Sequence, residues 1–373
     1  MLTNRIYKGP EMSLSEEIDA TKYRQEGESF DDKVKRLASA LSDDKEHKMY
    51  LEEILGYMRF LPAGKVQSSA GSKRITTAFN CFVSGQIDDN MASIMQRATE
   101  AAETMRKGGG IGYDFSKIRP NGDKIISLDS TASGPVSFMG IFDAVCQTIS
   151  SSGHRRGAQM GVLRVDHPDI EEFIITKRNS DKLTGFNVSV GITDAFMEAV
   201  LGLRSCDRDC DTCVCGDDSS CHCFDLVFEG SVYSTINAKS LWDKIMESTW
   251  DWAEPGVLFI DRIKEMNNLY YCEDINATNP CGEQPLPAHG ACLLGSFNLT
   301  QYLYKVNDGD EFFSFNFTQL KRDIPHVVRA MDNVIDRTIY PLKEQSDEAH
   351  NKRRMGLGLT GLANAGELSL IHI

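Results

Sequence analysis

Strand-like and helix-like segments alternate along the chain from about Arg74 onward, and this alternation limits the possible folds more than any other feature. A β-branched and aromatic run, ITTAFNCFVSG, predicts a strand that carries Cys81. A helix is predicted over about Ala92–Lys107, and it ends in the run GGGIG. Further segments of the two kinds lie near Ile170, Val188 and Trp242. The pattern predicts an α/β fold.

The N-terminal part of the chain has a different pattern. The segments DDKVKRLASALSDD and KEHKMYLEEILGYMRFL place apolar residues at helical spacing, and LPAGKVQSSAG then interrupts the pattern at Pro62. We therefore expect a helical N-terminal region over residues 1–75 and an α/β domain over residues 76–367, with a cysteine-rich insert at residues 204–224.

Composition narrows the class of protein. Apolar residues make up 41% and charged residues 25% of the 373 positions, which is typical of a globular chain. The net charge of −14 makes the chain a poor general binder of polymeric nucleic acid or of an anionic membrane. The start lacks the apolar stretch of a signal peptide, and no run approaches the roughly 18 apolar residues of a membrane helix. We expect a cytoplasmic protein.

The segment NPCGEQPL, residues 279–286, carries the most informative chemistry. Pro280 and Gly282 flank Cys281 and disfavour helix and regular strand, so a tight loop that presents a thiol is expected. With Asn279 and Glu283, one loop offers an amide, a thiol and a carboxylate, which suits chemistry on a polyol.

A second thiol, Cys292, follows the loop in the strand-like stretch ACLLGSFNL. The alternative interpretation is that Cys281 and Cys292 are small buried apolar residues. The Pro, Gly, Asn and Glu neighbours of Cys281 favour a chemical role for that residue.

Several further segments accompany this loop. They are LPAGKVQSSAG, KRITTAFNCF, EAAETMRKGGGIGYDFSKIRPNG, TASGPVSFMGIFDAVCQTISSSGHRRGAQMGVLRVDHPDIEEFI, FNVSVGITDAFMEAV, EPGVLFIDRI and RRMGLGLTGLA. Together with NPCGEQPL and CLLGSFNL, they resemble the catalytic subunit of ribonucleotide reductases over about Leu61–Gly366, apart from the cysteine-rich insert. The motif GEQPL and the short gap between Cys281 and Cys292 resemble those of the adenosylcobalamin-dependent class. The resemblance implies part of a ten-stranded α/β barrel made of two five-stranded halves, with the Cys281 loop at its centre.

The resemblance also implies a thiyl-radical mechanism that reduces ribonucleotides to 2′-deoxyribonucleotides. Cys281 would abstract the 3′-hydrogen of the ribose, Glu283 would take the proton of the 3′-hydroxyl, and Asn279 would hydrogen-bond the sugar. Such a radical needs a dry, shielded site. Cys81 and Cys292 would supply two electrons and end the turnover as a disulfide, which requires Cα atoms about 4.4–6.8 Å apart. Without the resemblance, Cys81 would be interpreted equally well as a buried strand cysteine.

Binding residues follow from the same resemblance. Gly110 would bring its backbone against the substrate, and Asn80 would contact it. Asp88 and Arg119 would hold a deoxynucleoside triphosphate effector, although alone they would be interpreted as solvated surface charges. The segments SSSGHRRGAQ and RNSDKLTGF match the two loops that link the effector to the choice of substrate.

The partners implied are a ribonucleoside di- or triphosphate, the effector and a thioredoxin-like reductant, and the protein would be a monomer or a homodimer.

The cysteine-rich insert predicts a metal site. Any four of its thiolates could bind a structural zinc ion tetrahedrally, while reduced thiols without order and a redox reservoir are the alternatives. The candidate ligands are Cys206, Cys210, Cys213, Cys215, Cys221 and Cys223.

Chains of this family continue past RRMGLGLTGLANAGE, so we expect a C-terminally truncated chain that is inactive as it stands. We expect residues 368–373, LSLIHI, to be a non-native tail, because they follow a glycine-rich helical segment abruptly.

Two other functions stay open. One is a reductase large subunit of the type that takes its radical from a separate metal-containing subunit. The other is a zinc-binding interaction module. A nicotinamide or flavin enzyme built on GGGIG has little support, since that run lacks the context of a phosphate loop.

Overall fold

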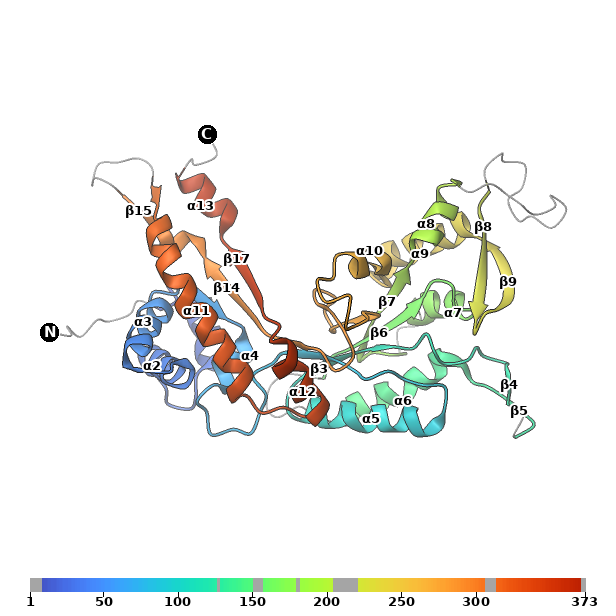
Figure 1. Ribbon diagram of the computed structural model, residues 1–373, viewed down its shortest axis with the longest axis horizontal. Helices are drawn as coiled ribbons and strands as arrows, with labels where there is room; N and C mark the ends of the chain where they lie inside the picture. The colour runs from blue at the N-terminus through green and yellow to red at the C-terminus, as the bar shows by residue number, and fades with distance from the viewer. Residues whose placement is uncertain are drawn as a thin grey trace. The chain divides into compact units, whose positions relative to one another are not determined.

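The computed structural model describes residues 9–125, 128–149, 157–178, 182–203, 221–305 and 313–369. Contacts divide the chain into two compact units (Figure 1). Unit 1 comprises residues 1–80 and 291–373, and unit 2 comprises residues 81–290. The two ends of the chain therefore build one unit together, while the predicted domain ranges 1–75 and 76–367 stay a prediction.

Unit 2 is built on five strands in the order β10, β7, β6, β3, β2, and every neighbouring pair is parallel. Parallel neighbours cannot be joined by a hairpin and need crossover connections. Helices supply these connections, so the alternation predicted from the sequence is confirmed, and the five strands form a half-barrel sheet. The strands are β2 (Cys81–Val83), β3 (Gly110–Asp114), β6 (Gln159–Arg164), β7 (Phe186–Ile192) and β10 (Gly256–Phe259). The helices are α5 (Met91–Arg106), α6 (Gly134–Thr148), α7 (Ile170–Ile175), α8 (Asp194–Val200), α9 (Ala238–Trp252) and α10 (Ile260–Glu265), with the 3-10 turn η2 (Thr176–Arg178).

Strand β3 shows how the sheet distributes its side chains. Successive residues of a strand point to opposite faces. Ile111 and Tyr113 are buried in the apolar core, which they share with residues of α5 and α6. Figure 1 shows these two helices beside each other along the sheet. Gly110 and Gly112 therefore point to the opposite face of the sheet.

Three two-stranded hairpins complete unit 2. Glu229 and Gly230 both have positive φ, 48° and 78°, at the tip of the β8–β9 hairpin, as a tight two-residue connection requires. Tyr233 of β9 donates to Asp123 at 2.7 Å and so ties this hairpin to the β4–β5 region. The strands are β4 (Lys124–Ile125), β5 (Ser130–Thr131), β8 (Cys223–Phe228), β9 (Ser231–Asn237), β11 (Ala277–Thr278) and β12 (Pro285–Leu286).

Unit 1 packs helices α2 (Phe30–Leu41) and α3 (Lys45–Gly56) against α11 (Phe317–Arg337). Helices α2 and α3 lie within residues 1–75, and the extent of the predicted helical N-terminal region stays a prediction. A three-stranded sheet has the order β1, β14, β17, antiparallel for the first pair and parallel for the second. The other elements are α1 (Ser13–Ile18), the π-helical turn η1 (Asp19–Tyr23), β1 (Phe60–Pro62), α4 (Gly64–Ser69), β13 (Ala291–Cys292), β14 (Leu294–Asn298), η4 (Leu299–Tyr302), β15 (Leu303–Tyr304), β16 (Ser314–Phe315), α12 (Lys343–Lys352), β17 (Gly356–Thr360) and α13 (Leu362–Ser369).

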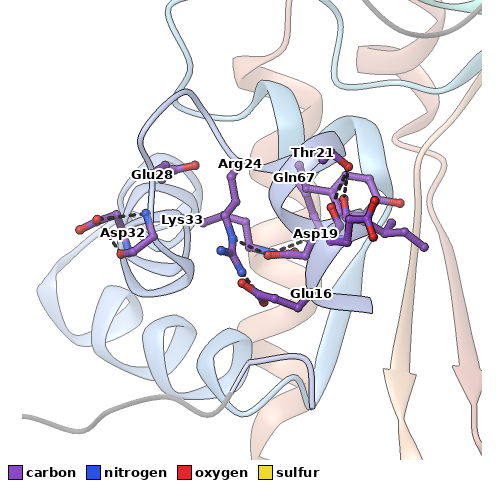
Figure 2. Close-up of polar contacts among 12 residues, drawn as sticks. Glu16, Asp19, Thr21, Arg24, Glu28, Asp32, Lys33 and Gln67 are labelled. Atoms are coloured by element: carbon purple, nitrogen blue, oxygen red, sulfur yellow. Dashed lines mark hydrogen bonds and ion pairs between the residues drawn. The ribbon is translucent and has the colours of Figure 1, made fainter. Parts of the chain in front are cut away.

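A charge network joins η1 to α2 and α4 in unit 1 (Figure 2). The carboxylate of Asp19 accepts from Arg24 Nε at 2.7 Å and from Lys33 Nζ, and both Asp19 and Lys33 are buried. Lys33 also donates to Gln67 of α4 at 3.2 Å. Burial lowers the pKa of Lys33, although the contact with Asp19 acts in the opposite direction. We call Asp19, Arg24, Lys33 and Gln67 the N-terminal charge network.

Two predictions about single elements need correction. The strand predicted over ITTAFNCFVSG is shorter, because only Cys81–Val83 pairs with β3. The run GGGIG does not merely end a helix, since Gly110 begins β3. The helix predicted over Ala92–Lys107 is confirmed as α5 within one residue at each end.

In the part of the chain that the structure describes, no helix is both long enough and apolar enough to cross a membrane.

Candidate active site

Cys281 lies at the tip of a small hairpin. Strands β11 and β12 pair antiparallel, and the loop between them is closed by backbone hydrogen bonds from Asn279 N to Gln284 O at 3.1 Å and from Gly282 N to Asn279 O at 3.0 Å. Gly282 has a φ of +82°, which glycine adopts without strain. The tight loop predicted around Cys281 is therefore present, and we call residues 279–284 the thiol loop.

The thiol loop rests on the open face of β3, where two glycines make room for it. A Cβ atom on Gly112 would lie 1.8 Å from the carbonyl oxygen of Thr278, and one on Gly110 would lie 2.8 Å from Pro280 Cγ. Any larger residue would push the hairpin away from the sheet. Gly112 was missed in the sequence, where glycines at alternate positions of one strand could have indicated a close backbone approach.

Cys81 lies beside the thiol loop. It is aligned with Gly110 across the β2–β3 pair, and its sulfur lies 3.6 Å from the point where a Cβ of Gly110 would be. Cys81 and Pro280 thus flank the same glycine. The contact of Gly110 with substrate stays a prediction.

Cys292 is buried on β13 and belongs to unit 1, so its pairing with Cys81 stays a prediction.

Asn279 is fully buried and uses only part of its hydrogen-bonding capacity. Its Oδ1 accepts from Gln284 N at 2.9 Å and so fixes the side chain. Its Nδ2 is buried without a hydrogen-bond partner in the described chain. The Oδ1 of Asn80 is likewise buried without a hydrogen-bond partner in the described chain. A buried polar atom without a partner costs about 1–3 kcal/mol, so each of these atoms is a candidate for binding a ligand.

The two reactive groups of the loop are exposed to solvent. Cys281 and Glu283 are both exposed, whereas Asn279 of the same loop is buried. The dry, shielded surroundings expected for a radical at Cys281 are therefore not present around this sulfur in the described residues.

Asp88 lines a pocket of about 580 Å³ in unit 2. Its carboxylate accepts from Gln86 Nε2. Arg119, the other predicted effector residue, is paired with Asp89, whose carboxylate accepts from Arg119 Nε at 2.5 Å and from its backbone N at 3.1 Å. The pocket is lined by Asp88, Asp89, Ser116, Lys117, Arg164, Asp166, His167, Val227, Phe228, Glu229 and Gly230.

His167 is the one buried histidine in the lining of this pocket. Its Nε2 lies 2.9 Å from Ile118 O, and its Nδ1 accepts from Asp169 N at 3.0 Å. These partners suit the neutral ring with a proton on Nε2. Burial lowers the pKa of His167, while nearby carboxylates act in the opposite direction.

The predicted zinc ligands fall in two groups. Cys206, Cys210, Cys213 and Cys215 lie outside the described residues, as do residues 150–156 and 179–181 of the two predicted effector-linked loops. Cys221 and Cys223 lie at the start of the β8–β9 hairpin. Within the described ranges, no cluster of three or more His, Cys, Asp or Glu side chains could hold a metal ion.

The sequence of the chain also matches a known protein family. The family model described as the ribonucleotide reductase barrel domain matches residues 79–367. The chain belongs to the ribonucleotide reductase family. The match includes the thiol loop, both of its supporting glycines and Cys81.

Several relatives in the family are named as vitamin B12-dependent enzymes. A vitamin B12-dependent ribonucleoside-diphosphate reductase of Thermoplasma acidophilum is 36% identical over 316 residues, which cover 84% of this chain and 38% of the relative. One of Mycobacterium tuberculosis is 37% identical over 311 residues, 83% of this chain and 41% of the relative. A vitamin B12-dependent ribonucleotide reductase of Streptomyces avermitilis is 31% identical over 380 residues, 97% of this chain and 38% of the relative. This chain thus spans about two-fifths of the length of these relatives.

Proposed function

We propose that the chain supplies the thiol loop and part of the substrate site of a cobalamin-dependent ribonucleotide reductase. The observation that carries this proposal is the thiol loop held against the paired glycines of β3, with Cys81 beside it on β2. Family membership and the names of the relatives support the reaction and the cofactor of this proposal.

In this proposal three residues of the loop have different roles in the reaction of the ribose. Cys281, as a thiyl radical, takes the hydrogen atom from C3′ of the substrate. Glu283 takes the proton of the 3′-hydroxyl, which allows the 2′-hydroxyl to leave as water. The buried Nδ2 of Asn279, which has no partner in the described chain, donates to a ribose hydroxyl and holds the sugar.

The reduction needs two electrons and two protons besides the radical. Cys81 and Cys292 supply them and become a disulfide, so one ribonucleotide and two thiols give one deoxyribonucleotide, one disulfide and one water. A thioredoxin-like reductant restores the thiols. Both sulfurs belong to buried residues, which protects the pair from other oxidants.

When bound, cobalamin would supply the radical chemistry that Cys281 needs. The exposure of this side chain supports the assignment, because a bound group must be able to reach the sulfur. The water-excluding surroundings would then come from the bound substrate and cofactor, and from the parts of the ten-stranded barrel that the five parallel strands of unit 2 do not supply.

The pocket lined by Asp88 is proposed to take a deoxynucleoside triphosphate effector. Arg119 would turn from Asp89 to the phosphates, since a guanidinium binds phosphate and carboxylate in the same way. A structural zinc ion in the cysteine-rich insert remains part of the proposal.

Turnover by a full-length enzyme containing this chain tests the proposal. Deoxyribonucleotide formation should depend on added adenosylcobalamin, and Cys281→Ser should lower the rate by about 10³-fold or more with an unchanged circular dichroism spectrum. Cys272→Ser, which changes another exposed cysteine of unit 2, should remain active. Turnover that requires a separate metal-containing subunit instead would overturn the cobalamin assignment, and an active Cys281→Ser enzyme would overturn the role of the loop.

A further inference from the structure

Asn187 reaches the thiol loop from the neighbouring part of the sheet. Its Nδ2 donates to the carbonyl oxygen of Pro280 at 2.7 Å, across 93 positions of the sequence. A carbonyl oxygen can only accept, so the amide nitrogen must face it. Pro280 directly precedes Cys281, and the hydrogen bond therefore holds the peptide that carries the thiol.

The sheet register places Asn187 on the same face as the loop. Gly112 is aligned with Met160, and Met160 is aligned with Asn187, so the three form a row across β3, β6 and β7. Gly112 lies against Thr278, and the methyl carbon of Met160 lies 3.9 Å from the point where a Cβ of Gly282 would be. Each member of the row thus meets the thiol hairpin at a different residue.

The backbone groups of the two residues that flank Asn187 are held by side chains. Lys177 Nζ donates to the carbonyl oxygen of Phe186, and Glu254 Oε1 accepts from the backbone N of Val188 at 3.2 Å. Lys177 and Glu254 also form an ion pair at 2.5 Å, with about one-fifth of each side chain exposed. Because these contacts fix the backbone of β7 here, the side chain of Asn187 can hold the carbonyl of Pro280 in one position.

We propose that Asn187 is a positioning residue that sets the orientation of Cys281 through the carbonyl of Pro280. This inference rests on the proposed function, because it gives Asn187 importance only if the sulfur of Cys281 reacts. The hairpin already has its own backbone hydrogen bonds, so Asn187 fixes the direction of its tip and not its existence.

The test measures the thiol and the turnover separately in the full-length enzyme. Asn187→Ala removes the donor, Asn187→Asp replaces it by an acceptor that repels the carbonyl, and Asn187→Gln retains a donor on a longer arm. Asn267→Ala is the matched control, because Asn267 also donates one Nδ2 hydrogen bond, to Glu273 at 2.9 Å, elsewhere in unit 2. Iodoacetamide labelling of Cys281 is followed by peptide mass spectrometry, with the exposed Cys272 as the reference within each sample.

We expect the ratio of labelling rates, Cys281 to Cys272, to rise about fivefold in the Ala and Asp variants, as the loss of one hydrogen bond allows. The turnover number kcat should fall by about 10-fold to 10²-fold with little change in KM, since binding persists while the reacting sulfur is misplaced. Asn187→Gln should lie between these variants and the unmodified enzyme, and Asn267→Ala should match the unmodified enzyme.

An unchanged labelling ratio and an unchanged kcat in both Asn187→Ala and Asn187→Asp would overturn the inference. The proposed function would survive that outcome if Cys281→Ser were still inactive. If Cys281→Ser were active, the proposed function would fail, whereas a changed labelling ratio would still show that Asn187 holds the loop.

Discussion

The thiol loop and the N-terminal charge network use polar groups in opposite ways. In the network, the charged side chains of Asp19, Arg24 and Lys33 each have two partners. In the loop, backbone groups and the Oδ1 of Asn279 make the hydrogen bonds, while the Nδ2 of Asn279 has no partner in the described chain. The chemistry-bearing Cys281 and Glu283 are exposed.

This difference indicates that the N-terminal charge network serves stability and that the thiol loop serves function. Partnered buried charges hold elements together, since breaking one pair leaves the other charge buried and uncompensated. A reactive group must keep its capacity for the substrate, so its position has to come from other atoms. Substitutions in the loop and its support should therefore lower activity more than stability, and substitutions in the network should do the reverse.

Among substitutions outside the thiol loop, Gly112→Ala gives the largest expected effect. The added methyl group would lie 1.8 Å from the carbonyl oxygen of Thr278, so the thiol hairpin has to move off β3. We expect kcat to fall by about 10²-fold, because a displacement near 1 Å at a reacting group has effects of that size. The measurement is steady-state turnover of the full-length enzyme beside its unfolding midpoint.

Gly140→Ala is the control for this substitution, since a Cβ there meets nothing within 4 Å in helix α6. It should stabilise the protein by about 0.5–1 kcal/mol and leave kcat unchanged. Full activity in Gly112→Ala would contradict the role of the glycines.

Lys33→Met tests the other side of the comparison. The change leaves the buried carboxylate of Asp19 with Arg24 as its remaining cation. We expect the free energy of unfolding of unit 1 to fall by about 3–4 kcal/mol, the lower part of the range for breaking a buried pair. Urea unfolding of the purified protein measures it.

Lys48→Met serves as the control for Lys33→Met, because in the described chain Lys48 pairs with Glu52 at 3.7 Å, with side chains 41% and 26% exposed. It should change the stability by less than about 0.5 kcal/mol. If the two lysine variants were equally stable, the network would not have the structural role given to it here.

His167→Gln should have a smaller effect, on the pH dependence of stability, and it tests a buried polar group of unit 2. The pKa of His167 is lowered by burial, so the unfolded chain binds a proton more readily than the folded one. The contribution of His167 to stability is therefore complete above the ordinary imidazole pKa of 6.5 and is lost as the pH falls from that value to the lower pKa of the folded state. Unfolding measured from pH 8 down to pH 5 should show a decline that is shallower in His167→Gln. An equally steep decline in both proteins would assign the pH dependence to other groups.

The sequence predicted those features that depend on neighbouring residues. Pro280 and Gly282 sufficed to predict the thiol loop, and alternating segments sufficed for the α/β class. The strand around Cys81 was predicted too long, because β propensity extends over ITTAFNCFVSG while only three residues find a pairing partner.

Features that depend on distant contacts were beyond such reasoning. Gly110 and Gly112 have low strand propensity, and their place in β3 depends on the hairpin that packs on them. Nothing near Asn187 in the sequence points to Pro280, and nothing near Asp19 points to Lys33, because those contacts exist only after the elements have packed.

The most direct test of the account is the product of a single turnover without added reductant. The full-length enzyme with adenosylcobalamin and ribonucleotide should form about one deoxyribonucleotide per active site. Peptide mapping should then find a disulfide between Cys81 and Cys292 in the same amount. Deoxyribonucleotide formed while both of these residues remain thiols would contradict the account.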